Sequence, residues 1–349
     1  MDALQFKDKT ALFKVCRLWL KVDNLAIAPY RSIHKFRHYM SRTSPKPSVS
    51  FVSSPVQRHA PWLYAFWKFS RPHTIIGTSC SVLGMYFIAA APFVFDPFAW
   101  FLPLLACLCG NVYIVGLNQL EDVAIDRINK PHLPLASGEF SRTQGVAIVT
   151  ITGVLAILLA ALQGPYLLAM VGLSLAIGTA YSLPPIRLKR FPFWASLCIF
   201  SVRGAIVNLG LFLHFNNGFP IPAKVWALTL FVLVFTFAIA IFKDIPDMEG
   251  DRQYNISTFT LRVGQRAVFN LSRWVLTVCY LGMVAAAFWL PLVNAPFLIV
   301  SHLLLVSALW LRSQKVDLHE PREVAKFYQF IWKMFFLEYL IFPIACFLR

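Results

Sequence analysis

Charged residues are scarce in this sequence: 14% of its 349 residues are charged, whereas 58% are hydrophobic. A soluble globular domain carries about 25% charged residues, so this balance argues against one. Apolar runs of about 20 residues recur, which is the length that a helix needs to cross a bilayer. Only helices or closed barrels satisfy their backbone groups in lipid, and barrel strands would alternate in polarity. The sequence therefore predicts an all-α, multi-pass transmembrane bundle of about nine helices, at 68–91, 98–121, 143–162, 165–184, 193–213, 223–244, 265–289, 294–311 and 327–348.

The sequence also lacks the cysteine patterns of metal and redox sites. Its seven cysteines include no C-x-x-C pair and no His/Cys cluster, and six of them fall in the apolar runs. Neither a zinc site nor a disulfide framework is therefore indicated. We expect these thiols to act as small buried hydrophobic groups.

Acidic residues are half as frequent as basic ones, 16 against 32, which gives a formal net charge of +16. Such a charge can indicate nucleic-acid binding, but its placement gives another explanation. Lys and Arg gather before the first span and in alternate loops, while the intervening loops carry only Lys224. The positive-inside rule puts the N terminus and these basic loops on one face, cytoplasmic or stromal, and an odd number of spans puts the C terminus on the other. No nucleic-acid partner is needed to explain the charge.

Residues 1–61 differ from the predicted transmembrane domain at 62–349. A basic amphipathic stretch at 13–25 has the character of a membrane-surface segment. The Ser/Pro-rich run TSPKPSVSFVSSP (43–55) that follows is typical of disorder. A transit peptide is the alternative, although three aspartates count against it because such peptides are poor in acids.

The segment NQLEDVAIDRINKP (118–131) follows an almost uncharged apolar run. Its residues Asn118, Asp122 and Asp126 are four positions apart, so on a helix they lie along one stripe. Glu121 lies about 100° away and is not expected to share their task.

A second acidic group closes the sixth span in KDIPDMEGDR (243–252), where Asp244, Asp247 and Asp251 share one face if the helix continues through Pro246. The charge pattern places both groups at one membrane face, where they would repel each other unless cations sat between them. A single carboxylate often only marks where a helix emerges into water, but two matched stripes favour a metal site. Oxygen ligands suit Mg²⁺, whose shell phosphates often complete.

Basic side chains lie in the loops of the same face. We expect them to bind a diphosphate, since guanidinium and ammonium groups suit that anion: they are Arg127, Lys130, Arg187, Lys189 and Lys243. A diphosphate, Mg²⁺ and an apolar cavity inside a lipid bilayer together indicate an isoprenyl diphosphate substrate.

The two acidic segments resemble the paired aspartate-rich motifs of the UbiA superfamily of membrane prenyltransferases. The resemblance continues through FWKFSRPHTIIGT (66–78), LPLASGEFS (133–141), TAYSLPPIRLKRFP (179–192) and VRGAIVNLGLFLHF (202–215). It is nearest to the homogentisate prenyltransferases, in particular the phytyltransferase branch, and it covers the chain from about residue 62 onward. Glu121 departs from the family pattern, in which an aromatic, small or hydroxylated residue is more usual.

The resemblance implies a reaction and a set of roles. Mg²⁺ would bind the diphosphate, and the C1–O bond would ionise to an allylic cation. An aromatic acid, homogentisate, would then attack C1 and lose CO₂, giving a precursor of tocopherol or another prenylquinone. The implied metal ligands are Asn118, Asp122, Asp126, Asp244, Asp247 and Asp251, with Asp122, Asp126, Asp247 and Asp251 as the catalytic acids. Tyr181 and Lys189 resemble the family's substrate-binding Y…K element, and His73 resembles a residue near the acceptor.

Three further polar residues fall inside predicted spans. Arg203 lies in the middle of the fifth span, where an unpaired charge costs on the order of several kcal/mol. We expect it to bind a substrate anion, either the diphosphate or the carboxylate of homogentisate, with a structural acid partner as the alternative. Asn208 either lines the acceptor cavity or makes a helix–helix hydrogen bond. No role is assigned to Glu338.

A membrane transporter is the alternative of another class, because charges inside the membrane also mark permeation paths. A carrier is expected to hold its polar residues near the bilayer midplane, whereas these acids gather at one face. Chlorophyll synthase-like and flavonoid or coumarin prenyltransferases are the alternatives within the superfamily. The sequence leaves open the prenyl chain length, the protein partners, and whether the membrane is that of a plastid or the bacterial cytoplasmic membrane.

Overall fold

The structure is a computed structural model that describes residues 59–89, 98–254 and 256–348. The expectations for residues 1–58 therefore lie outside the described residues. The chain divides into two compact units, Met1–Tyr64 and Ala65–Arg349. The arrangement below is that of the second unit.

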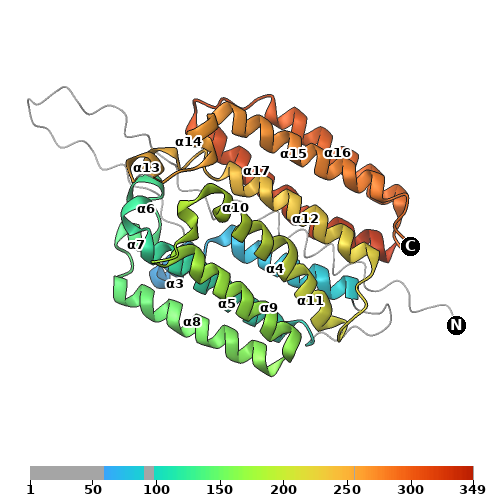
Figure 1. The fold of residues 1–349 in the computed structure, drawn as a ribbon, viewed down its shortest axis with the longest axis horizontal. Helices are drawn as coiled ribbons and strands as arrows, with labels where there is room; N and C mark the ends of the chain where they lie inside the picture. The colour runs from blue at the N-terminus through green and yellow to red at the C-terminus, as the bar shows by residue number, and fades with distance from the viewer. Residues whose placement is uncertain (1–58, 90–97, 255, 349) are drawn as a thin grey trace, which may run out of the picture. The chain divides into compact units, whose positions relative to one another are not determined.

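The described residues form helices joined by short turns, and they contain no strand. Figure 1 labels the helices along the chain: α3 (Pro61–Phe69), α4 (Pro72–Ala89), α5 (Phe101–Glu121), α6 (Val123–Asn129), α7 (Pro134–Ser137), α8 (Arg142–Leu162), α9 (Pro165–Ser182), η2 (Leu188–Arg190), α10 (Pro192–Phe200), η3 (Ser201–Ile206), α11 (Val207–Phe215), α12 (Ala223–Phe242), α13 (Met248–Gln253), α14 (Phe259–Val263), α15 (Gln265–Ala286), α16 (Ala295–Ser313) and α17 (Pro321–Phe347).

Within the described ranges, eight helical segments are long and apolar enough to cross a membrane. They correspond to eight of the nine predicted spans, and the prediction of an all-helical membrane protein is confirmed. The first predicted span, 68–91, contains α4, which is not among the eight. The reason is its composition, because α4 opens with Pro72 and His73 and carries several Ser and Thr residues.

Local sequence signals set where several helices begin. Ser141 and Gln144 form a capping box at the start of α8, in which each side chain bonds the backbone of the other residue. Asn294 caps α16 by accepting a hydrogen bond from the backbone of Phe297. Proline occupies the first turn of α9, α10, α16 and α17, where its missing N–H has no partner to lose.

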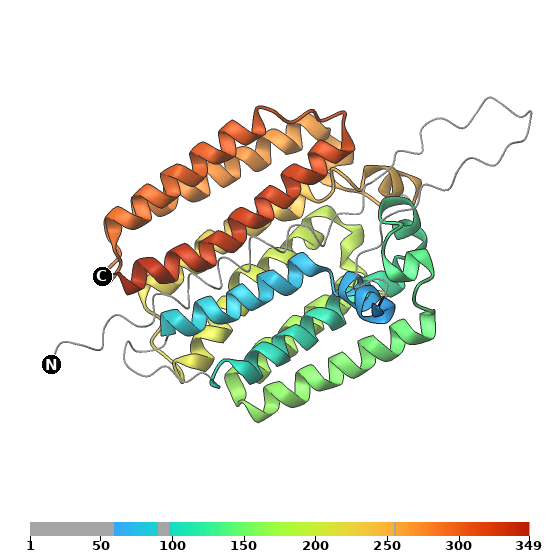
Figure 2. The ribbon, with the colours of Figure 1, turned by 180° about the vertical axis from the view of Figure 1, so that it is seen from behind.

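Helix α12 lies in the interior of the bundle, and twelve of its twenty residues are buried. It packs against α15 and α17 on one side and against α10 and η3 on the other. Helix α5 packs closely against α8 and also contacts α9 and α4. Figure 2 shows α4 between these two groups, next to α17.

The fifth predicted span is a single membrane-length segment, Pro192–Phe215, built from α10, η3 and α11. Its central part, Ser201–Ile206, is π-helical rather than α-helical, and Arg203 lies within it. Such π-bulges are rare and occur frequently at functional sites.

The two acidic segments lie at the same end of the bundle. Figure 1 shows α6 and α13 side by side there, and the last turn of α17 at the opposite end. Their orientation relative to the two faces of a membrane stays a prediction.

Candidate functional site

The first acidic motif spans a helix break. Helix α5 ends at Glu121, and α6 begins at Val123 after the non-helical backbone of Asp122. The 1→5 hydrogen bonds nevertheless continue, from the Asp122 N–H to the Asn118 carbonyl at 3.1 Å and from the Asp126 N–H to the Asp122 carbonyl at 2.8 Å. The predicted stripe therefore survives the break, and Asn118 Nδ2 donates to Asp122 Oδ2 at 3.0 Å.

The second motif is not a continuation of a helix. Helix α12 ends at Phe242, turns follow, and α13 begins at Met248. The helix therefore does not continue through Pro246, and the three aspartates do not share one helical face as predicted. Proline lacks the N–H of the helical ladder and restricts the residue before it, which explains the break. Asp244 and Asp247 lie in the turns, and Asp251 lies in α13.

The two motifs meet through residues of α6 and α13. The backbone N–H of Gly250 donates to Asn129 Oδ1 at 2.8 Å. A side chain at position 250 would collide with that amide, because an added Cβ would lie 2.5 Å from Asn129 Oδ1. Lys130 Nζ also donates to Asp247 Oδ2 at 2.5 Å. The first motif thus contacts the second at two adjacent positions.

Basic side chains from the segment after α9 complete the site. Lys189 Nζ lies 2.7 Å and Arg187 Nη2 lies 3.2 Å from the same oxygen, Asp122 Oδ1. Lys189 is buried, and desolvation lowers the pKa of its ammonium group, against the opposing effect of Asp122. The site therefore holds two cations close to one carboxylate.

Lys243 links the second motif to α9. Its Nζ lies 3.6 Å from Asp244 Oδ1 and donates to the Tyr181 hydroxyl at 3.3 Å. Tyr181 and Lys189, which resemble the family's substrate-binding element, therefore both contact side chains of the acidic motifs.

Two carboxyl groups of the site, those of Asp126 and Asp251, have raised pKa values. Burial, followed by the charges of Asp247 and Asp244, raises the pKa of Asp251 to about 7. Burial also raises the pKa of Asp126, whose Oδ2 is buried without a hydrogen-bond partner. An additional cation would relieve both, and carboxylate oxygens are the ligands that Mg²⁺ prefers.

The six predicted ligands do not form one tight cluster. Among the described residues, no three His, Cys, Asp or Glu side chains lie close enough together to hold a metal ion. Like charges repel, and three of the acids instead turn towards ammonium or guanidinium groups: Asp122, Asp244 and Asp247.

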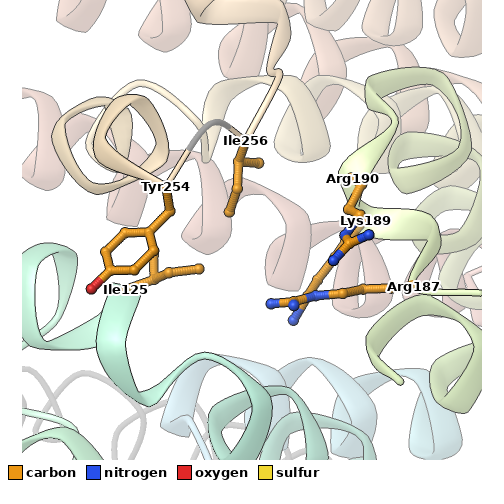
Figure 3. A pocket seen from close by; sticks show the side chains of 6 residues that line it. All are labelled: Ile125, Arg187, Lys189, Arg190, Tyr254 and Ile256. Carbon is orange, nitrogen blue, oxygen red and sulfur yellow. The ribbon is translucent and has the colours of Figure 1, made fainter. Parts of the chain in front are cut away.

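A cavity of about 340 Å³ opens beside the basic residues (Figure 3). In the figure, Arg187 and Lys189 extend from one wall towards the α6 and α13 side, which carries Ile125 and Tyr254. The remaining lining residues are Arg190 and Ile256. A cavity with three cations along one wall can accept an anion such as a diphosphate.

One predicted diphosphate ligand lies apart from the others. Arg127 is exposed, and no ion pair forms at its side chain in the described part of the chain. It follows Asp126 by one position on α6, which turns its side chain about 100° away from the stripe.

The three predicted acceptor residues lie near α17. His73 contacts the Trp332 ring with centroids 4.8 Å apart, and the Arg203 guanidinium lies 5.3 Å from the same ring. Asn208 is fully buried, donates to the Gly204 carbonyl at 2.8 Å and accepts from the Tyr339 hydroxyl at 2.7 Å. Its amide is thus engaged within the protein, which favours the helix–helix alternative.

Glu338 acquires a partner in the structure. Its Oε2 lies 3.1 Å from His302 Nε2 on α16, and both side chains are fully buried. This pair joins α16 to α17.

The sequence interpretation missed two residues of the site. Arg71, just before α4, donates from Nη2 to Asn118 Oδ1 at 3.2 Å. It adopts a left-handed backbone with φ +53°, and its position in the first turn of the first predicted span, on the basic face, could have indicated a role. Asn129 was the other, and its only sequence signal was its place one turn after Asp126.

Comparisons with known proteins match these features. The model of the UbiA prenyltransferase family matches residues 78–334. The homogentisate phytyltransferase of Synechocystis sp. is 55% identical over 82% of this chain and 96% of its own length. The chloroplastic homogentisate phytyltransferase 1 of Arabidopsis thaliana is 38% identical over 89% and 82%.

Solved structures show the same fold. A UbiA homolog from Archaeoglobus fulgidus, bound to GPP and Mg²⁺, superposes with a TM-score of 0.60 at 16% identity, over 80% of this chain and 99% of that one. The predicted family is confirmed: the chain belongs to the UbiA prenyltransferase family.

Proposed function

We propose that this protein transfers a prenyl group, phytyl or a related chain, from a prenyl diphosphate to homogentisate with loss of CO₂, in the synthesis of tocopherols or related prenylquinones. The carrying observation is that two acidic motifs, 117 residues apart at Lys130 and Asp247, meet beside a cluster of buried and half-buried cations. The acceptor is proposed because the relatives from Synechocystis and Arabidopsis are named homogentisate phytyltransferases.

Mg²⁺ is the metal that we propose for the site. The acids of both motifs supply oxygen donors, and the partnerless Asp126 Oδ2 and the like-charge environment of Asp251 fit a bound cation. The residues that would hold it are Asn118, Asp122, Asp126, Asp247 and Asp251, with Asp244 beside them. When bound, the ion would neutralise charge that develops on the leaving diphosphate.

The chain's own residues neutralise the rest of that charge. Arg187 and Lys189 converge on one oxygen of Asp122, so their charges are held in place before a substrate arrives. Lys130 and Lys243 hold the second motif in the same way. This arrangement favours departure of the diphosphate with the electron pair of the C1–O bond.

The acceptor then reacts with the allylic cation and loses its carboxyl group. A ring carbon of homogentisate bonds C1 of the allylic cation and loses its proton, and the carboxyl group leaves as CO₂ while its methylene carbon gains a proton. The product is a prenylated methylquinol. We propose that the prenyl chain lies among the apolar membrane-length helices, where water that would quench the cation is scarce.

The protein is an integral membrane protein. We propose that its site faces the N-terminal side, stromal in a plastid or cytoplasmic in a bacterium. Because the chain belongs to a prenyltransferase family, we do not retain the transporter alternative. The experiment below identifies the prenyl donor.

The test uses membranes of an expressing host with Mg²⁺, homogentisate and a panel of prenyl diphosphates. We expect a prenylated methylquinol, identified by mass, with one preferred donor. Membranes that contain the folded protein but form no such product from any donor would refute the proposal. An Asp126→Asn variant in matched amounts controls for activity of the host.

A further inference from the structure

Arg203 is a half-buried charge, and no acid partner for it lies among the residues that the structure describes. It lies inside a membrane-length segment, in the π-helical turn Ser201–Ile206. In the described part of the chain it takes part in no ion pair, and the titratable side chains near it include two neutral tyrosines, Tyr328 and Tyr339. An intramembrane arginine without a counter-charge is costly, which indicates that an anion joins it during function.

Aromatic rings surround this guanidinium. Trp332 and Phe335 of α17 lie 5.3 Å and 5.8 Å from it, and His73 of α4 packs on the same Trp332 ring. Gly77 of α4 makes room for the guanidinium of Arg203, since an added Cβ there would lie 2.8 Å from Arg203 Nη1. A charged fork among ring faces is a suitable site for the carboxylate of an aromatic molecule.

The diphosphate already has other cations. Arg187, Lys189 and Lys130 contact the acidic motifs directly, whereas none of the six predicted metal ligands forms an ion pair with Arg203. A diphosphate bound at the acids would therefore engage those cations, and the anion at Arg203 is a different group.

His73 is near both regions, since it packs on the Trp332 ring beside Arg203 and follows Arg71 by two positions. The charges of Arg71, Arg203 and Lys130 all act on its imidazole, and Arg71 is bonded to Asn118 of the first motif. An aromatic ring beside His73 would thus lie near both the first motif and Arg203.

From this arrangement we infer that Arg203 binds the carboxylate of the aromatic acceptor and that Trp332 and His73 line the site of its ring. The pocket thereby selects an acidic acceptor over a neutral one. The inference rests on the proposed function for the identity of the acceptor.

The experiment compares homogentisate with its neutral methyl ester. Binding of each to the purified full-length protein in nanodiscs is measured by calorimetry without donor, and KM is then measured for homogentisate and for the prenyl diphosphate. In Arg203→Met we expect the Kd and KM of homogentisate to rise at least about tenfold, the loss typical of a hydrogen bond to a charged group. The Kd of the ester and the KM of the donor should stay within about threefold of wild type.

Two further variants test whether the effect is specific to the position of the Arg203 guanidinium. Arg273→Met removes another arginine within a membrane span, one that lies 4.7 Å from Trp310 and bonds Ser313 and Asn270, and should leave homogentisate binding unchanged. Gly77→Ala keeps Arg203 but displaces the flexible end of its side chain, so it should weaken binding of the acid and not of the ester.

The outcomes separate the two proposals. A wild-type protein that binds the acid in preference to the ester but forms no product refutes only the proposed function. Equal binding of acid and ester by wild type, or a raised donor KM with unchanged homogentisate binding in Arg203→Met, overturns the inference. If Arg203→Met does not fold, unchanged binding of the acid in folded Gly77→Ala overturns it.

Discussion

Gly250→Ala is expected to disable the site by separating the two acidic motifs. The added Cβ would lie 2.5 Å from Asn129 Oδ1, about 0.9 Å short of the 3.4 Å at which ordinary contact begins. Asn129 is buried and accepts the hydrogen bond from the Gly250 backbone, so the strain is relieved mainly by moving α6 and α13 apart. A displacement of about 1 Å can cost about 10²-fold in rate, and we expect kcat/KM to fall by about that factor.

A double-mutant cycle tests the cause. Asn129→Ala alone loses one hydrogen bond, worth about 1 kcal/mol, and should lower kcat/KM about fivefold. With Asn129 shortened, the alanine at 250 meets no amide, so the double variant should resemble Asn129→Ala rather than the product of both losses. Prenyl transfer is measured in membranes normalised for inserted protein.

Gly282→Ala is the matched control. It adds the same methyl group to a helical glycine, and nothing lies within 4 Å of the added Cβ. Its activity should equal that of wild type. Full activity in Gly250→Ala would refute the reasoning, and so would a double variant that loses the product of both single effects, because then the collision with Asn129 is not the cause.

The remaining predictions concern the metal, the topology and the N-terminal extension. Asp126→Ala and Asp251→Ala should each lower turnover by about 10²-fold or more while the protein still inserts. EDTA should abolish wild-type activity until Mg²⁺ is restored. Activity that persists in EDTA would contradict the metal site. Cysteines placed at His132 and Gln253, in a background without reactive native thiols, should be labelled from the same side of sealed vesicles; labelling from opposite sides would exclude a shared site. A protein that begins at Ala60 should insert and retain its rate within about threefold, since both motifs lie beyond that point; a stably inserted but inactive protein would show that the extension completes the site.

Most of the fold could be predicted because membrane insertion depends on local sequence. An apolar run of sufficient length must satisfy its own backbone in lipid, so the segments that became α5, α8, α12 and α15 were predictable without any long-range contact. Helix α4 was also predicted, within the span 68–91, although its Ser and Thr residues lower its hydropathy; one of them, Thr74, accepts a hydrogen bond from Asn111 of α5.

The sequence by itself also determined the chemistry of the site, since residue types and spacing identify Asn118, Asp122 and Asp126 as oxygen donors on one stripe. It did not determine their partners. Only the tertiary structure brought Lys189 to Asp122, Asn129 to Gly250, and the rings of α17 around Arg203. Those contacts join residues 67 to 132 positions apart, and they depend on how whole helices pack. Hydropathy and periodicity describe what each helix presents, whereas packing decides which helix it meets.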